Sequence, residues 1–194
     1  MPRPDVSQER KAQILQAALE LFSQSGYEAA SMNDLAARCN LSKAAIYHYF
    51  DSKDAILLAL TESIFQADTR ELLALEQSPL PAEERLRTYM QSLVEAIQAL
   101  KPLHGMFMEF YSQATRTDAI RGHLQRYYDQ YERTLTTIFQ QGIDSGEFAA
   151  HDAQQATQAL MVAIDGAIVL SIIRQIDLGQ LINQALDVIL RAMH

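Results

Sequence analysis

A short stretch in the first third of the chain carries an excess of positive charge. Three cationic side chains, Arg38, Lys43 and Lys53, stand there against a single anionic one, Asp51. The whole chain is acidic, since 16 Lys and Arg against 24 Asp and Glu give a formal net charge of −8. Ammonium groups attract phosphate and release its counterions, and a helix N-terminus also attracts anions. Lys43 and Lys53 are therefore candidates for phosphate binding, although net charge taken alone argues against a nucleic-acid partner.

Catalytic and metal-binding residue types do not occur at the spacings that such sites need. There is no glycine-rich phosphate loop or GxSxG elbow, and the single cysteine, Cys39, excludes a disulfide within the chain and a CxxC motif. No HxxxH or HExxH spacing joins the five histidines, which are His48, His104, His123, His151 and His194. We therefore expect no enzyme activity, no metal and no cofactor.

The composition is that of a soluble globular protein. Of the 194 residues, 48% are hydrophobic and 21% are charged, which is too apolar for intrinsic disorder. The first residues hold no apolar core of a signal sequence, and no stretch offers about eighteen uncharged apolar residues. We expect a cytoplasmic protein with no membrane partner.

The hydrophobic pattern predicts an all-α fold of about nine helices. Alternation typical of strands is nearly absent, and the chain has only seven glycines and five prolines. Caps and breakers place helices at about 7–25, 32–39, 43–49, 51–77, 82–99, 102–114, 117–143, 152–174 and 178–193.

Two of these helices match the helix-turn-helix arrangement. Ser31 and Ser42 are suitable N-caps, and the turn at residues 39–42 contains Asn40, which tolerates the left-handed conformation. The first short helix would pack Leu35 and Ala36 inward. The second, anchored in the core by Leu41 and Ile46, would offer its polar face to the major groove. Short serine-capped helices also occur in other all-helical domains, so the spacing is compatible both with DNA binding and with a purely structural role.

Several short motifs occur along the stretch 10–57, namely Ile14-Leu15, Ala17-Ala18, Leu21-Phe22, Gly26-Tyr27, Leu35-Ala36, Ser42-Lys43, Tyr47-His48-Tyr49-Phe50 and Lys53. With these motifs the stretch resembles the N-terminal DNA-binding domain of the TetR family of transcriptional regulators. The resemblance covers about a quarter of the chain. It implies a three-helix DNA-binding domain over 1–54, a linking helix over about 51–77, and a variable ligand-binding and dimerisation domain over 78–194. Asn40 stands where glycine is common, and Ala44-Ala45 replaces a commoner small polar pair.

The resemblance implies a role in DNA binding for each residue around the second short helix. Tyr47 and His48 should donate to phosphate oxygens, Ala44 and Ala45 can approach base edges and thymine methyls, and Tyr49 could reach phosphate or base. The serines are caps first, and Arg3, Arg10 and Lys11 form either a basic arm or a solvated tail. The expected DNA-binding residues are Ser31, Ser42, Lys43, Ala44, Ala45, Tyr47, His48, Tyr49 and Lys53.

The last two helices are the candidates for dimerisation. Both are apolar on several sides, which either builds a core within the chain or forms a four-helix interface with a second copy, as the resemblance implies. Gly166 allows close approach of helices. The expected dimerisation residues are Leu160, Ile164, Gly166, Ala167, Ile168, Leu186 and Ile189.

Aromatic and methionine side chains in two central helices could line an apolar ligand pocket, although such stripes also build cores. Asp165 lies in an apolar run, where an unpaired carboxylate would be costly. It could pair with Arg174 or a tyrosine, or face a cationic ligand. The candidate ligand-binding residues are His104, Phe107, Met108, Phe110, Tyr111, Tyr127, Tyr131 and Asp165.

The combined hypothesis is a homodimeric transcriptional regulator, a repressor that binds a palindromic operator in double-stranded DNA and is released by a small molecule. The alternative is a helical protein-interaction module without a ligand response.

Overall fold

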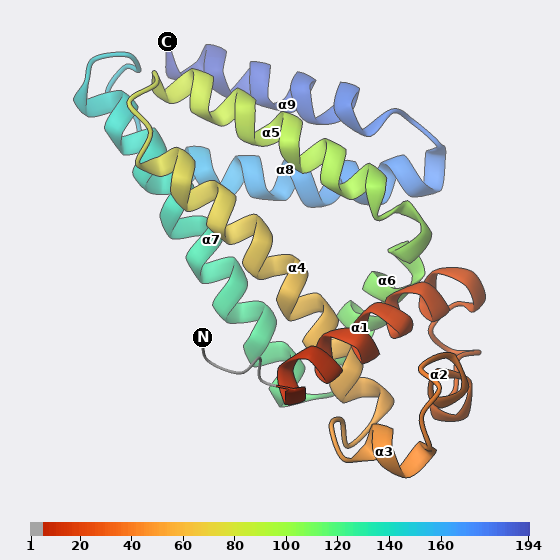
Figure 1. Cartoon of the computed structure of the whole chain (residues 1–194). Coiled ribbons are helices and arrows are strands. Elements are labelled where there is room, and N and C mark those ends of the chain that lie inside the picture. Colours follow the sequence, from red (N-terminus) through yellow and green to blue (C-terminus); the bar gives the residue numbers. More distant parts are fainter. Residues whose placement is uncertain (1–5) are drawn as a thin grey trace. The chain divides into compact units, whose positions relative to one another are not determined.

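In the computed structural model, residues 6–194 are described, with side chains from Ser7 onward, so Arg3 of the expected basic arm lies outside the described residues. This part of the chain contains nine α-helices and one short 3-10 helix, and no strand (Figure 1). The all-α prediction is confirmed. The helices are α1 (Val6–Ser25), α2 (Met32–Arg38), α3 (Lys43–Tyr47), α4 (Lys53–Glu76), α5 (Ala82–Ala99), η1 (Lys101–Leu103), α6 (His104–Ala114), α7 (Asp118–Asp144), α8 (Ala153–Arg174) and α9 (Leu178–Met193).

The caps that the sequence predicts set most of these bounds. Ser31 and Asp34 form a capping box at α2, and the Ser42 Oγ accepts from the Ala45 N–H at 3.1 Å. Aspartates cap the last two helices, because Asp152 accepts from two N–H groups of α8 and Asp177 accepts from one of α9. Local hydrogen bonding therefore defines where these helices begin.

Three predicted helix bounds differ from the structure by two residues. One is the start of α6, which begins at His104 instead of residue 102 because the 3-10 helix η1 occupies Lys101–Leu103. The helix α3 ends at Tyr47 instead of residue 49, because the Tyr49 N–H and the Phe50 N–H both donate to the Ile46 carbonyl and turn the chain. The helix α4 begins at Lys53 instead of residue 51, since the Ser52 Oγ accepts from the Ala55 N–H at 3.0 Å. The helix α3 is therefore two residues shorter than expected.

The chain divides into two compact units. The first holds the chain up to Phe65 together with Leu100–Leu124, and the second holds Gln66–Ala99 together with Gln125–His194. The helix α4 contributes residues to both. The expected division at residues 54 and 78 concerns function and stays a prediction.

A core of apolar side chains holds the first three helices together. Ile14 of α1, Leu35 of α2 and Ile46 of α3 are each at most 1% exposed. Two sharp turns connect them, at Gly26 with φ of +79° and at Asn40 with φ of +54°. The left-handed conformation expected at Asn40 is confirmed, and it lets the chain reverse between α2 and α3.

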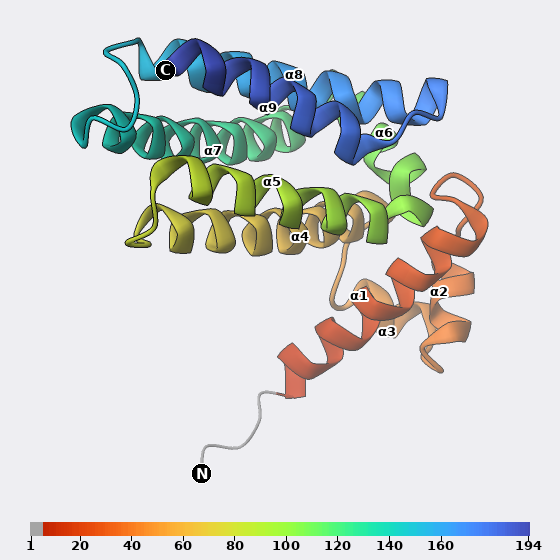
Figure 2. The same cartoon turned by 90° about the horizontal axis from the view of Figure 1, so that it is seen from above.

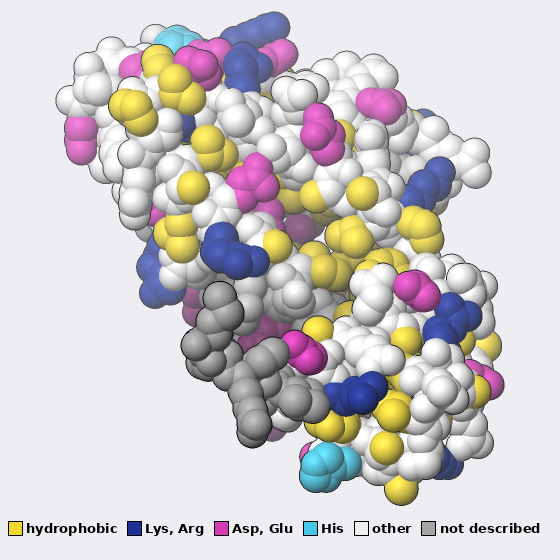
Figure 3. Space-filling model, in the orientation of Figure 1, with side chains coloured by type: hydrophobic (Ala, Val, Ile, Leu, Met, Phe, Trp, Pro, Cys, Tyr) yellow, Lys and Arg dark blue, Asp and Glu magenta, His cyan; other side chains and the backbone are white. Residues whose placement is uncertain are grey.

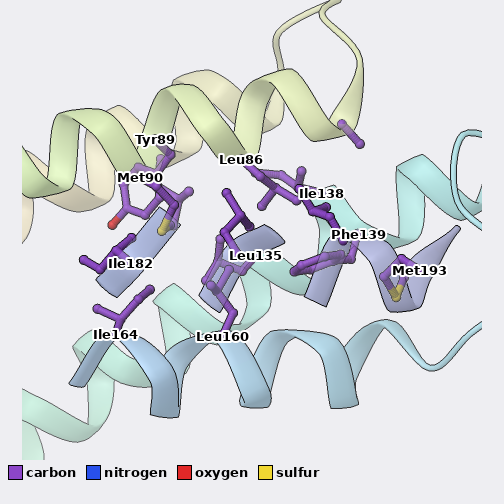
Figure 4. Packing of buried hydrophobic residues seen from close by; sticks show 14 of the residues in the cluster. Leu86, Tyr89, Met90, Leu135, Ile138, Phe139, Leu160, Ile164, Ile182 and Met193 are labelled. Carbon is purple, nitrogen blue, oxygen red and sulfur yellow. The ribbon is translucent and has the colours of Figure 1, made fainter. Parts of the chain in front are cut away.

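The core of the second unit is formed by α5, α7, α8 and α9. Figure 4 shows Leu135 of α7 between Leu86 of α5 and Leu160 of α8, and all three are fully buried. The helices α8 and α9 lie side by side (Figure 2). Because this core uses one face of each helix, another face of α8 is left outside it.

By length and composition, α8 could cross a membrane, and it is the one described helix that meets this test. The core helices of soluble proteins pass the same test, so this observation is weak evidence for a membrane span.

Candidate nucleic-acid interface and buried aromatic clusters

The turn between α2 and α3 fixes the orientation of α3. The Leu41 N–H donates to the Ala36 carbonyl at 2.9 Å, and Ile46, on the inner side of α3, is 0% exposed. Leu35 and Ala36 are buried as predicted, whereas Leu41 is only half-buried. A five-residue helix cannot stand alone in water. Its conformation therefore depends on the Ser42 cap and on the contacts of Ile46 with the core.

The outer face of α3 carries the predicted DNA-binding side chains. Lys43, Ala44 and His48 are exposed and Tyr47 is 42% exposed, so Tyr47 is not a core residue. The Lys43 ammonium lies 6.0 Å from the Tyr47 ring centroid. Figure 3 shows Lys or Arg, His and hydrophobic side chains exposed over the α2–α3 end of the first unit. This face offers a cation and a phenol to a partner without rearrangement of the core.

The remaining side chains of the segment are more enclosed or already engaged. Ala45 and Tyr49 are half-buried, and the His48 and Tyr49 rings meet edge to face at 5.1 Å. Ser31 and Ser42 are exposed, and each hydroxyl oxygen accepts a backbone N–H as a cap. The capping role that the sequence indicates for both serines is confirmed.

The Lys53 ammonium has partners within the protein. It donates to the carbonyls of Tyr27 at 2.8 Å, Ala30 at 3.1 Å and Glu28 at 3.3 Å, and lies 4.2 Å from the Tyr27 ring centroid. An ammonium has three donors, and the three carbonyls match that number. Lys53 therefore ties the start of α4 to the loop between α1 and α2, a role that its sequence position does not reveal.

A second link joins the same loop to α4 and α6. The Tyr27 hydroxyl donates to Asp54, and the Gln113 amide donates to the same carboxylate at 3.2 Å. Burial raises the pKa of Tyr27, and its hydrogen bond to Asp54 raises it further. Sequence reasoning missed this link, since Gln113 and Asp54 are 59 positions apart.

Two aromatic ligand candidates of α6, Phe107 and Phe110, belong to one cluster of the first unit. Phe107 and Phe110 have ring centroids 6.4 and 6.1 Å from that of Phe65, and His123 stacks on Phe65 at 5.9 Å. Phe110 is fully buried, His104 and Phe107 are half-buried, and Met108 and Tyr111 are exposed. Phe65 and His123 were missed because they lie on other helices.

The other candidates, Tyr127, Tyr131 and Asp165, belong to the second unit. The Tyr128 hydroxyl donates to Asp165 at 3.2 Å, so the aspartate pairs with a tyrosine and not with Arg174. This cluster also contains Asp68 and Tyr89, which sequence reasoning missed. The eight candidates are thus divided between the two units, five in the first and three in the second.

The expected dimerisation residues are partly inside the second unit. Leu160, Ile164, Ala167 and Leu186 are at most 5% exposed and belong to its own core. Ile168 and Ile189 pack against that core, and Gly166 is exposed. The exposed apolar residues of α8 and α9 are others, namely Val162, Val169, Leu170, Ile172, Ile173 and Val188.

Comparison with known families assigns both parts of the chain. Residues 14–60 match the family described as bacterial regulatory proteins of the tetR family. Residues 82–193 match the family described as the C-terminal part of BetI-type transcriptional repressors, which is more than half of the chain.

Individual relatives agree with this assignment. The HTH-type transcriptional regulator YfiR of Bacillus subtilis is 28% identical over 141 residues, which is 72% of this chain and 68% of that protein. A TetR transcription regulator from Haloarcula marismortui has the same fold, with a TM-score of 0.84, 23% identity and coverage of 96% of this chain and 98% of that one.

A transcriptional regulator from Saccharomonospora viridis, solved in complex with choline, also shares the fold. Its TM-score is 0.79 at 23% identity, and the match covers 94% of this chain and 96% of that one. With a helix-turn-helix matched by one family and a C-terminal part matched by another, the chain belongs to the TetR family of DNA-binding transcriptional regulators.

Proposed function

We propose that this protein is a cytoplasmic repressor that binds a palindromic operator as a homodimer and is released by a small-molecule effector. The observation that carries the proposal is the outer face of α3. Lys43, Tyr47 and His48 are exposed there on a helix that Ile46 and the Ser42 cap hold in place. Such a face can enter a major groove, which is about 12 Å wide, and contact phosphates at its edges.

The proposed DNA-binding residues are the nine expected from the sequence, and they contribute in different ways. Lys43 is free to neutralise a phosphate, whereas Lys53 contributes by holding the α1–α2 loop and positioning the start of α4. Ala44 is exposed and small, so the α3 backbone can approach base edges closely. Phosphate contacts from Tyr47 and His48 would set the register of the helix.

The dimer interface in this proposal is the outer face of α8. Val162, Gly166, Val169 and Ile173 follow one another at spacings of four, three and four residues, which places them along one side of a helix. Val162 and Ile173 are each 72% exposed, and nothing lies within 4 Å of where a Gly166 Cβ would be. A second copy offers the same apolar stripe and a glycine that permits close approach.

Two-fold symmetry of that dimer accounts for a palindromic operator. The two α3 helices would enter successive major grooves, about 34 Å apart. An effector would favour a conformation in which α4 carries α3 away from this spacing, and so would shift the population away from DNA. The choline complex of the Saccharomonospora viridis regulator supports a small-molecule response.

The test is selection of random duplex DNA by the purified protein, followed by anisotropy titration of the enriched sequence at several salt concentrations. Enrichment of a palindrome, with affinity that falls steeply with salt, supports the proposal. If the folded protein enriches no sequence, the helical interaction module becomes the better interpretation.

A further inference from the structure

A pocket lies at one end of the second unit, where the α4–α5 loop meets the turn that follows α7 (Figure 1). This loop pocket is lined by residues between Glu76 and Arg85 and between Gln141 and Glu147. Its volume of about 770 Å³ suits a small molecule, and it is open to solvent. None of the candidate ligand-binding or dimerisation residues lines it.

Hydrogen bonds between segments far apart in the sequence fix the walls of the loop pocket. The Glu147 carboxylate accepts from the N–H groups of Ala82 at 2.6 Å and of Glu83 at 2.8 Å, which places its charge at the N-terminus of α5. Gly146, with φ of +77°, makes the turn just before it. The fold therefore builds this pocket, and the charge of Glu147 is partly compensated by the helix.

A buried arginine lines the loop pocket. Arg85 is 5% exposed, and its Nη1 donates to the Glu76 carbonyl at 2.9 Å and to the Gln141 Oε1 at 2.5 Å. No described residue accepts a hydrogen bond from its Nε or Nη2, and Nη2, unlike Nε, is not enclosed by the protein. Since a guanidinium group carries five N–H donors, three donors of this buried side chain are unused.

The unused donors lie together on one edge of the guanidinium group. In arginine, Nη1 is on the same side as Cδ, so the Nε–H and one N–H of Nη2 point away in parallel directions. Such a pair matches the two oxygens of a carboxylate, which can accept from both N–H groups at once. Nη2 gives a ligand its first contact, and Nε lies beside it on the same edge.

The positive charge of Arg85 also has no carboxylate partner within the described part of the chain. The ion pairs found there are made by other arginines and by His194, and neither Glu76 nor Glu147 forms one with Arg85. A buried charge is costly unless an opposite charge or hydrogen bonds compensate it. An anion at the open edge of Arg85 would supply both.

We propose that the loop pocket binds a small organic carboxylate, with its carboxylate group on the Nη2–Nε edge of Arg85 and its apolar part against Pro79, Leu80 and Pro81. These three residues line the same pocket, and Leu80 is 39% exposed there. Covering such side chains with an apolar group is favourable in water. The site lies beyond the proposed function, because it requires neither DNA nor a second copy of the chain.

Other ligand classes fit the loop pocket less well. A cation would be repelled by Arg85, and the Glu147 carboxylate that could attract it already accepts two N–H groups. A doubly charged phosphate would be repelled more strongly than a carboxylate by Glu76 and Glu147. A neutral molecule would leave the charge of Arg85 unbalanced. A singly charged acid with an apolar body satisfies both the arginine and the apolar wall.

The test is isothermal titration of the full, DNA-free protein with benzoate and, as its neutral isostere, with benzamide. The two probes have nearly the same shape and differ in charge. Benzoate is expected to bind at least about tenfold more tightly than benzamide, a difference of about 1.4 kcal/mol, and more tightly than inorganic phosphate. Equal affinity for benzoate and benzamide, tighter binding of phosphate, or no heat with benzoate, hexanoate and cyclohexanecarboxylate would overturn the proposal.

Two arginine variants locate the site. Arg85→Lys keeps the charge but loses the paired donors, so it should raise the Kd for benzoate at least about tenfold. Arg87→Lys is the matched control on the same helix, because Arg87 is exposed and outside the pocket, and it should leave the Kd within about twofold. Circular dichroism shows whether each variant is folded. Equal effects of the two variants would place the carboxylate elsewhere.

A third variant tests the site without altering the arginine. Glu76 is half-buried and lines the loop pocket, so its negative charge opposes a bound carboxylate. Glu76→Gln removes that charge and should tighten benzoate binding at least about twofold, a gain that loss of structure would not produce. Unchanged or weaker binding by this variant would contradict the proposal even if Arg85→Lys does not fold.

Discussion

Replacing Lys53 with Met should destabilise the first unit, whereas the same replacement at Lys43 should weaken DNA binding without destabilising the fold. The two lysines stand ten positions apart in the segment that resembles a DNA-binding domain, and both are candidates for phosphate. The structure gives the two lysines different surroundings. Lys43 is exposed, and the Lys53 ammonium donates to three carbonyls of the α1–α2 loop.

The magnitude follows from the contacts that methionine cannot make. Each hydrogen bond to a half-exposed ammonium contributes about 1 kcal/mol, so three contribute about 3 kcal/mol. The ammonium 4.2 Å from the Tyr27 ring centroid adds about 0.5–1 kcal/mol. For a chain of this length, about 2–4 °C of Tm is lost per kcal/mol, so the total of about 3.5–4 kcal/mol gives a fall of about 7–16 °C.

Thermal unfolding followed by circular dichroism measures the first effect. Lys43→Met serves as the matched control, since it makes the same chemical change on an exposed side chain and should alter the free energy of unfolding by less than about 0.5 kcal/mol. In anisotropy titrations with the selected operator, Lys43→Met should lower the slope of log K against log salt by about one per subunit.

A Lys53→Met protein that melts like the parent and loses the same salt slope as Lys43→Met would refute this reasoning. Lys53 would then be a phosphate ligand, and its three carbonyl contacts would contribute nothing measurable to stability.

Three further results are expected. Ile173→Asp should convert the proposed dimer to a monomer in light scattering, because it places a charge in the apolar stripe of α8, while Leu80→Asp, at a 39% exposed position, should leave the oligomeric state unchanged. Burial raises the pKa of Asp68 in the folded parent protein, so its free energy of unfolding should fall as the pH rises from the ordinary pKa of an aspartate to the raised one. Urea titrations of Asp68→Asn across this pH range should lack that fall, and an unaltered pH dependence would contradict the prediction. Phe139→Ala, at a fully buried position of the second core, should cost about 3–5 kcal/mol in the same assay, and a loss below about 1 kcal/mol would show that this core is loosely packed.

The sequence alone predicts the helices and the DNA-binding segment well, because both depend on interactions between near neighbours. Serine and aspartate caps, hydrophobic spacing and the left-handed Asn40 act within a few residues, and the helices α5 and α9 begin and end within one residue of their predicted bounds. The exposed face of α3 was predictable for the same reason, since Ile46 marks the inner side of a very short helix.

Tertiary structure decides which side of each long helix is buried and which distant side chains meet. The apolar residues of α8 surround much of its circumference, so periodicity could not show that Leu160 and Ile164 face the core while Val162 and Ile173 face outward. Asp68 meets Tyr127 across 59 positions of sequence.

The partners of Lys53 show the same limit in the DNA-binding segment. Its sequence position indicates a cation at a helix start, which suits phosphate, but the ammonium reaches carbonyls 23 to 26 residues earlier. Such contacts depend on how helices pack, because charge and spacing specify what a side chain can bind but not which groups the fold places beside it.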